Sequence, residues 1–395
     1  MDKVINFGIP HVAEQIFEYV NVAALLQSRL VSKTWKEIAE SVLLKRWRET
    51  FVTACQIGHI DVVEQIIESS EWQTIDLNIT DDRGKTGFML ACQEGRVNVI
   101  KLLLNHPKCE EIEMNIKDSQ GMTAFVLACE NGQQNVVKLL INHSKSHGID
   151  LNVKSSHGLT GFLMACHKER IGVLKLLLEH PDNQDLELNS QNNFGASAFM
   201  LACCNEDITL AKLLLDQSER RNIDLNRRNV AGMTGFMQAC RLGQIDTVKL
   251  LLDHPAKKNI ELNMTDIGGR TALMYACVQG WKDVVELLLD HSKSQQIDLN
   301  FRNNQGYTAF MLACQSGQMD VVELLLTHPK SKIINFNARN TNGETALMRA
   351  CRHGTPNMIK LILNHSTSKN ILLPTKDQSI LFRQEIIDLL TQKSQ

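Results

Sequence analysis

Cysteine recurs in this sequence at one fixed interval. Nine cysteines stand 37 residues apart, at Cys55, Cys92, Cys129, Cys166, Cys203, Cys240, Cys277, Cys314 and Cys351. Thiols at a regular spacing could bind zinc, but no C-x-x-C pair is present to set such a site. They could also pair, but a disulfide needs Cα atoms within about 7 Å, and facing helices lie about 8–10 Å apart. We therefore predict that these thiols are small, buried, apolar groups.

Histidine keeps the same register. It stands at His106, His143, His180, His254, His291, His328 and His365, and Gln217 takes the place in one unit. A row of imidazoles could relay protons or bind metal. One histidine per unit is too sparse for chelation, and each follows an apolar run. We expect these side chains to end helices, where they interact with free carbonyls and the negative end of the helix dipole.

Motifs of known enzyme classes are absent from the sequence. There is no H-E-x-x-H, no G-x-x-x-x-G-K-[ST] and no G-x-G-x-x-G, and the acidic residues show no fixed pairing. We therefore predict no catalytic residue, no metal and no cofactor, and we expect that the chain is not an enzyme.

The composition of the chain limits the classes of partner that it is expected to bind. The chain has 395 residues, of which 43% are hydrophobic and 22% charged, with a formal net charge of -2. This balance favours neither nucleic acid nor an anionic membrane as a partner. No apolar run approaches the ~18 residues of a membrane span, and the N-terminal residues lack an apolar signal core. We expect an intracellular protein, cytoplasmic, nuclear or both, in which thiols stay reduced.

The period itself indicates the elements that position these residues. A repeat of 20–50 residues is typical of a solenoid whose units contact only their neighbours. In the unit that starts at Asp76, residues 88–92 and 99–104 each carry apolar residues at helical spacing, and Gly95 separates them. Thr86 is placed to cap the first helix, and residues 78–84 are polar and turn-like. Because a helix pair this small cannot bury its apolar faces alone, we predict a stack.

The unit resembles the ankyrin repeat. Asp81-Asp82-Arg83-Gly84-Lys85-Thr86, the following GFMLAC, and the run from Val99 to Leu104 match its D-x-x-G-x-T start and its V-V-x-L-L-L helix, and the match returns over roughly residues 50–372. Gly-Phe-Met or Ala-Phe-Met replaces Pro-Leu-His, Pro or Ser replaces the usual loop glycine, and the loop is four residues longer. The resemblance implies an all-α fold: nine helix pairs with β-hairpin-like fingers over residues 49–372, closed by a truncated capping unit at 373–395.

Residues 5–47 do not repeat, and they resemble an F-box. Ile9-Pro10, Ile16-Phe17 with Val20, and the RLVSKTW block from Arg29 to Trp35 match that family. The resemblance implies that residues 1–48 dock on the Skp-type adaptor of a cullin-RING (SCF) ubiquitin ligase. The residues that would supply this contact are Ile9, Pro10, Ile16, Phe17, Val20, Leu30, Val31 and Trp35. The alternative is that the segment caps the N-terminal end of the solenoid.

Ankyrin arrays typically bind proteins through finger tips and the exposed side of the first helix, on their concave face. The middle units, residues 187–317, carry aromatic, methionine and arginine residues at such positions, which is typical of interface cores. The predicted substrate-binding residues are Phe194, Val230, Met233, Arg241, Leu242, Ile267, Arg270, Tyr275 and Tyr307. The alternative for each is packing on the neighbouring unit.

Together these features predict a substrate-recognition subunit of an SCF-type E3 ubiquitin ligase. The adaptor and cullin would bind through the F-box, and a protein substrate would bind the array. Two alternatives remain at this point: a non-degradative ankyrin scaffold that tethers two proteins, and a microbial or viral effector that borrows a host ligase.

Overall fold

The structure of the chain is a computed structural model. It describes residues 45, 48–68, 76–181, 185–254, 260–291, 296–353 and 355–374. The chain forms two compact units, Met1–Glu187 and Leu188–Gln395, and each is described by itself below.

The first unit consists of helix pairs. Residues 48–57 are helical and precede the first labelled helix. The elements that follow are α5 (Ile60–Glu68), α6 (Gly87–Gln93), α7 (Val97–Asn105), the 3-10 helix η2 (Pro107–Glu111), α8 (Ala124–Glu130), α9 (Gln134–Asn142), α10 (Gly161–His167) and α11 (Ile171–Glu179). The prediction of an all-α array of helix pairs is thereby confirmed for this unit.

The second unit continues the same order. Its elements are α12 (Ala198–Cys204), α13 (Thr209–Arg221), α14 (Gly235–Leu242), α15 (Ile245–Asp253), α16 (Ala272–Gln279), α17 (Lys282–Asp290), α18 (Ala309–Gln315), α19 (Met319–Thr327), the 3-10 helix η5 (Pro329–Ile333), α20 (Ala346–His353) and α21 (Pro356–Asn364). The predicted capping unit at 373–395 falls almost entirely outside the described residues.

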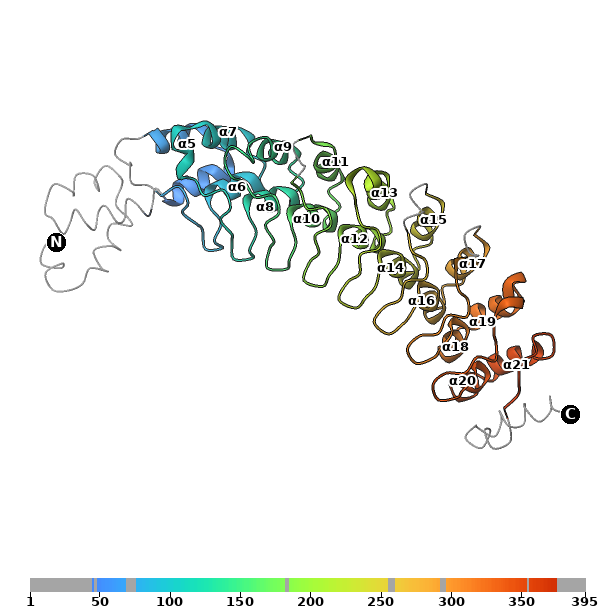
Figure 1. Cartoon of the computed structure of the whole chain (residues 1–395). Helices are drawn as coiled ribbons and strands as arrows, with labels where there is room; N and C mark the ends of the chain where they lie inside the picture. Colours follow the sequence, from blue (N-terminus) through green and yellow to red (C-terminus); the bar gives the residue numbers. More distant parts are fainter. Residues whose placement is uncertain are drawn as a thin grey trace, which may run out of the picture. The chain divides into compact units, whose positions relative to one another are not determined.

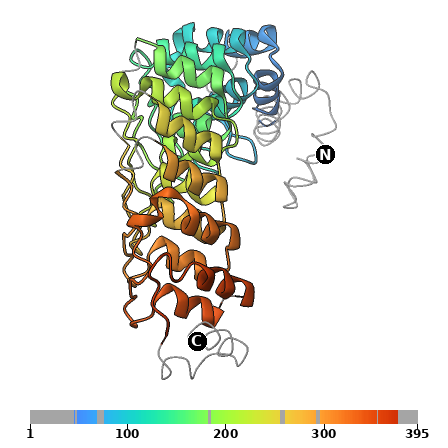
Figure 2. The same cartoon turned by 90° about the vertical axis from the view of Figure 1, so that its right-hand side faces the viewer.

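Helices of each unit lie in two layers. In the first unit α6, α8 and α10 pack on one another in one layer, and α5, α7, α9 and α11 form the other. In the second unit α12, α14, α16, α18 and α20 form one layer, and α15, α17, α19 and α21 pack in the other. Figure 1 shows the loops before the first helices projecting away from the second layer. Figure 2 shows the helices of each layer stacked side by side.

The first helices are short, and they are buried nearly all round. In α8, residues 124–129 are all 1% exposed or less. A helix that is apolar on every face belongs in a protein interior, and neighbouring first helices together with the second layer enclose it. Alanine and cysteine at the centre of each helix allow this close packing. The second helices are amphipathic; in α9 Val136, Val137, Leu140 and Ile141 are buried.

A hydroxyl caps the start of each first helix. Thr86 Oγ1 accepts a hydrogen bond from the Met89 amide at 3.1 Å, and Thr86 itself is in the extended conformation of an N-cap. The same bond forms at Thr123, Thr160, Ser197, Thr234, Thr271, Thr308 and Thr345. The predicted cap is therefore confirmed, and it fixes where the loop ends and the helix begins.

Proline and serine, which replace the usual loop glycine, have different local structural roles. Pro107 and Pro329 each begin a 3-10 turn, because proline lacks the amide that a continuing helix would need. Ser144, Ser218 and Ser366 are buried, and each hydroxyl donates to the carbonyl three residues earlier at 2.7–2.8 Å. Pro107 and Pro329 therefore follow the end of an α-helix, whereas Ser218 lies within α13, which continues to Arg221.

Within the described residues, no helix is long and apolar enough to cross a lipid bilayer.

Candidate protein-interaction surface

Each projecting loop is a hairpin-like turn that one polar side chain organises. In the loop before α12, Asn192 Oδ1 accepts from the amides of Phe194 at 3.0 Å and Ala196 at 2.9 Å. The Asn192 amide donates to the Ala196 carbonyl at 3.1 Å. The same position carries Asp, Asn or Ser in every described loop. The predicted fingers are therefore present, held by turn bonds; among the described residues the β-bridge that forms in a finger joins Thr80 and Thr86.

Glycine is required at the finger tip for two reasons: the backbone has a positive φ there, and the next finger lies close to it. Gly195 has φ +72, in the left-handed region, and a Cβ built on it would lie 2.7 Å from the Val230 amide nitrogen of the next finger. Only glycine fits both conditions.

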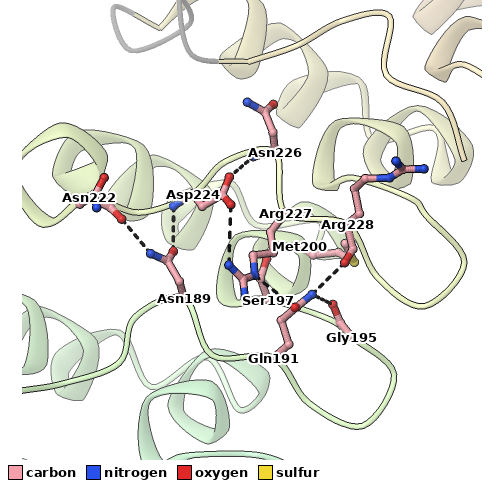
Figure 3. A network of polar contacts seen from close by, with 10 residues as sticks. All are labelled: Asn189, Gln191, Gly195, Ser197, Met200, Asn222, Asp224, Asn226, Arg227 and Arg228. Atoms are coloured by element: carbon pink, nitrogen blue, oxygen red, sulfur yellow. Dashed lines mark hydrogen bonds and ion pairs between the residues drawn. The ribbon is translucent and has the colours of Figure 1, made fainter.

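A ladder of asparagines fixes the base of the fingers. Asn189 donates from Nδ2 to the Asn222 carbonyl at 2.8 Å and accepts at Oδ1 from the Asp224 amide at 2.8 Å. Figure 3 shows this bridge and the adjoining side chain of Gln191, which bonds Arg227 and the Arg228 carbonyl. Equivalent pairs of bonds are made by Asn78, Asn115, Asn152, Asn263, Asn300 and Asn337. Each asparagine thus supplies a donor and an acceptor to the next loop.

Finger tips of the second unit form a continuous backbone ladder. The Val230 amide donates to the Phe194 carbonyl at 3.1 Å, and the Ile267 amide to the Ala231 carbonyl at 3.1 Å. The ladder continues with Asn304 to Gly268 and Thr341 to Gln305, both at 3.0 Å. Neighbouring tips are therefore in direct contact and present one surface.

Three apolar side chains stand on consecutive tips of that surface. Phe194 is 70% exposed, Val230 71% and Ile267 71%. A single exposed apolar side chain is ordinary on a protein surface, whereas several grouped on one surface indicate an interaction site.

Two known sequence families match this chain. The sequence profile described as ankyrin repeats (3 copies) matches residues 51–155, 162–262, 236–335 and 297–372, which together cover more than half of the chain. The chain belongs to the ankyrin-repeat family. A profile of the F-box domain matches residues 10–47, so this ankyrin-repeat protein also carries an F-box. Both are protein-interaction modules without catalytic groups of their own.

A solved structure shares the ankyrin fold. It is titled the crystal structure of the ankyrin repeat domain of Bcl-3, a unique member of the IkappaB protein family. The similarity has a TM-score of 0.52 and 24% sequence identity, and it covers 62% of this chain and 99% of that one. No curated protein matches the chain at a significant level.

Not all the predicted substrate-binding residues of the ankyrin array reach its surface. Phe194, Val230 and Ile267 are at the tips, as described above. Met233 is 7% and Tyr307 8% exposed, because these side chains turn inward at the point where the finger joins its helix. We therefore correct the expectation for these two, which pack within the array and do not form part of an accessible surface.

The other predicted residues lie at two further places. Arg270 is exposed, with its guanidinium carbon 5.9 Å from the centre of the Tyr275 ring. The Tyr275 hydroxyl donates to Asp266 at 2.6 Å, and burial together with this bond raises the pKa of Tyr275 to about 12. Arg241 and Leu242 lie instead at the far end of α14, and the Trp281 indole donates to the Arg241 carbonyl at 3.0 Å. The array thus separates Arg241 and Leu242 from the finger surface.

The predicted adaptor contacts belong to the N-terminal segment of the chain. Ile9, Pro10, Ile16, Phe17, Val20, Leu30, Val31 and Trp35 lie outside the described residues. Their assignment rests on the sequence match alone.

The nine cysteines in register are buried and unpaired, as predicted. Burial raises the pKa of the Cys55 and Cys351 thiols to about 12 and also raises the pKa of the other seven. Thiolates, the reactive form, are therefore disfavoured. Cys204, outside the register, is half-buried. Within the described ranges, no three His, Cys, Asp or Glu side chains gather as a metal site.

The histidines in register do lie at the ends of second helices, but several of them form bonds to the neighbouring repeat. His143 Nδ1 contacts the Leu139 carbonyl at 2.9 Å, as expected of a helix end. His254, His291 and His328 instead contact an aspartate of the preceding second helix, at 2.8–2.9 Å, namely Asp216, Asp253 and Asp290. The sequence signal for this ladder was an aspartate 38 residues before the histidine.

Sequence reasoning missed a row of basic side chains along the fingers. Arg228 donates to the Gly232 carbonyl of its own finger at 3.0 Å and to the Thr265 carbonyl of the next at 2.7 Å. Arg302 makes the equivalent bonds to Gly306 and Arg339, and Arg339 bonds Gly343. The sequence did contain a signal for this row. A long side chain with a hydrogen-bond donor recurs at this position of the repeat, as Lys117 and Gln191 in earlier repeats.

Proposed function

We propose that this chain is the substrate-recognition subunit of an SCF-type cullin-RING E3 ubiquitin ligase. The observation that supports the proposal is the F-box match at residues 10–47 directly before an ankyrin array that spans residues 51–372. In this arrangement the F-box binds the Skp-type adaptor and, through it, the cullin. The array is then left to hold a target protein.

The finger surface supports the second half of the proposal. Phe194, Val230 and Ile267 expose apolar side chains from a backbone ladder that is already formed, so binding would not have to order these loops. A receptor of this kind contributes recognition and no bond chemistry. By holding the target near the ubiquitin donor, it would raise the effective concentration of the target lysines.

Co-purification tests the F-box assignment. The full chain is produced together with a Skp-type adaptor and a cullin, beside an Ile16→Ala/Phe17→Ala variant. We expect the wild type to retain both partners, and we expect the variant to lose them, because a buried anchor typically contributes about 2 kcal/mol or more to binding. The control is Ile333→Ser, which removes another apolar side chain, 63% exposed, far along the array.

Retention of both partners by the wild type and the control, but not by the double variant, supports the proposal. If the wild type binds neither adaptor nor cullin, the ligase assignment is wrong. The chain would then be an ankyrin scaffold whose N-terminal segment serves as a cap.

A further inference from the structure

The strongest unexplained feature of the second unit is the uneven charge of its fingers. Residues 226–233, 263–270, 300–307 and 337–344 contain five arginines and two acidic residues. Both acids are buried and already bonded: Asp266 accepts from Tyr275 at 2.6 Å, and Glu344 pairs with Arg349 at 3.1 Å. The exposed part of these loops is therefore basic.

Four of the five arginines form no ion pair with a described residue. Arg227 lies 4.0 Å from Asp224. Among the described residues, no carboxylate lies within ion-pair distance of the remaining four, which are all exposed: Arg228, Arg270, Arg302 and Arg339. The nearest other acidic residues along the chain lie at the bases of these fingers. The charge at the tips therefore favours an anionic partner.

Apolar and basic groups follow one another along the same ladder. Phe194, Val230 and Ile267 occupy the first three fingers of the unit. Arg228 lies in the second finger, and Arg270, Arg302 and Arg339 occupy the last three. Facing helices lie about 8–10 Å apart, so five fingers extend over roughly 30–40 Å. An extended chain advances about 3.3 Å per residue, so roughly ten to twelve residues would cover the ladder.

We propose that these fingers bind an extended protein segment that carries apolar side chains at one end and aspartate or glutamate side chains at the other. The inference rests on the proposed function, because it names the class of substrate segment that the receptor would hold. The apolar side chains of the segment pack on Phe194, Val230 and Ile267. Its carboxylates pair with the guanidinium groups of Arg270, Arg302 and Arg339.

The spacing of the arginines favours carboxylates over phosphate groups. A phosphate is best bound where several cationic groups converge on it. Here each finger offers one guanidinium, and Arg302 and Arg339 already donate some of their hydrogen bonds to finger carbonyls. This arrangement suits single negative charges about 8–10 Å apart.

The same ladder is a poor site for nucleic acid. Single strands bind through aromatic side chains on which the bases stack, and two of the three exposed apolar tips, Val230 and Ile267, are aliphatic. The occupant that fits both halves of the surface is therefore a protein segment.

Fluorescence polarisation with the full chain, without adaptor or cullin, tests the proposal. The probe is a labelled twelve-residue peptide with three leucines in one half and four glutamates in the other, separated by serines. The same sequence reversed covers the second chain direction. Matched peptides replace the glutamates by glutamine or by phosphoserine, and a twelve-nucleotide single strand of DNA is the fourth probe.

We expect one glutamate peptide to bind at least ten-fold more tightly than its glutamine counterpart, with affinity that falls as salt rises. Ile267→Ser and Arg270→Gln should each weaken binding about five- to ten-fold. Lys249→Gln, which removes an exposed charge from α15, should not. Arg302→Gln is a second charge variant that keeps an amide donor, and thermal unfolding checks that every variant folds.

The proposal is overturned if neither glutamate peptide binds better than its glutamine counterpart, or if the array variants bind like the wild type. Tighter binding of the phosphoserine peptide or of the DNA would overturn the carboxylate assignment. Because the assay contains no adaptor, a failure here leaves the F-box assignment untouched, and a failure of adaptor binding leaves the peptide result intact.

Discussion

Arg349 and Glu344 form a buried ion pair at the base of the last described finger. Arg349 Nη1 lies 3.1 Å from Glu344 Oε2, and both residues are less than 10% exposed. Asn340 and Arg352 also bond the carboxylate, and the Arg349 guanidinium lies over the ring of Tyr307 at 5.5 Å. The pair therefore ties the finger to α20.

Removing one partner of this pair should be costly. Arg349→Met leaves a buried carboxylate with only Arg352 as its cation, and we expect α20 and α21 to lose about 3 kcal/mol of stability. The double variant Glu344→Gln/Arg349→Met should recover most of that loss. Hydrogen exchange of the amides in residues 346–364 measures the effect, because repeats open locally. Equal protection in the single variant and the wild type would contradict this role.

Acid should weaken the same contact. Burial raises the pKa of Glu344, but the Asn340 hydrogen bond and the charges of Arg349 and Arg352 outweigh it, so the pKa lies below the usual glutamate value. A lowered carboxyl pKa contributes stability that is present above the unfolded-state pKa and is lost as pH falls through the folded-state pKa. The difference in protection between wild type and Glu344→Gln should therefore be constant near neutral pH and shrink below about pH 4.5. A difference that persists unchanged at pH 3 would argue against a charge effect.

The asparagine ladder should contribute to stability through both of its bonds. Asn300 donates to the Ile333 carbonyl at 2.7 Å and accepts from the Asn335 amide at 2.6 Å. Asn300→Ala should cost about 1–2 kcal/mol, and Asn300→Asp, which keeps the acceptor, should cost less. Urea unfolding gives the stabilities, and exchange of the Asn335 amide shows whether the acceptor remains. Faster exchange at Asn335 in Asn300→Asp than in Asn300→Ala would refute this reading.

The buried cysteines should be chemically silent in the folded chain. Burial raises the pKa of each thiol in the register, so little thiolate forms at pH 8. In a Cys109→Ser/Cys204→Ser variant, a thiol reagent such as Ellman's reagent should find almost no reactive group until denaturant is added. All nine thiols should then react. Rapid labelling of the folded variant would show that the register is accessible.

There is little space at the start of α10. A substitution there should therefore destabilise the fold even if it favours the helix. A Cβ on Gly161 would lie 2.5 Å from Phe125 Cε1 in the adjacent repeat. Gly161→Ala gains up to about 1 kcal/mol of helix propensity, but overpacking should cost about 1–3 kcal/mol. We expect a lower unfolding midpoint, partly restored by Phe125→Leu in the same chain. A more stable single variant would mean that the ring moves aside freely.

Local features of the fold could be predicted from the sequence because they depend on neighbouring residues. Thr86 caps its helix through the amide three residues ahead, and Gly195 sits where the turn needs positive φ. Cys129 is buried because its unit repeats an apolar pattern that stacking must cover. The Asn189 bridge was missed, since its partners, Asn222 and Asp224, lie in the next repeat.

The candidate surface was predicted only in part. Val230 and Met233 belong to one finger and are both apolar, yet Val230 is 71% exposed and Met233 only 7%. Local propensity does not separate them, because the difference arises where the finger folds back onto its helix.

The sequence by itself determined the repeat, the order of the helices, their caps, the buried thiols and the two families, since each of these follows from residue types at fixed spacing. The tertiary structure decided which side chains share a surface. Phe194, Val230 and Ile267 come together because backbone bonds join successive tips, and the Asn304 amide joins the finger of Arg302 to that of Ile267 through the Gly268 carbonyl. These contacts join residues about 37 positions apart, and their geometry is set only when the repeats stack.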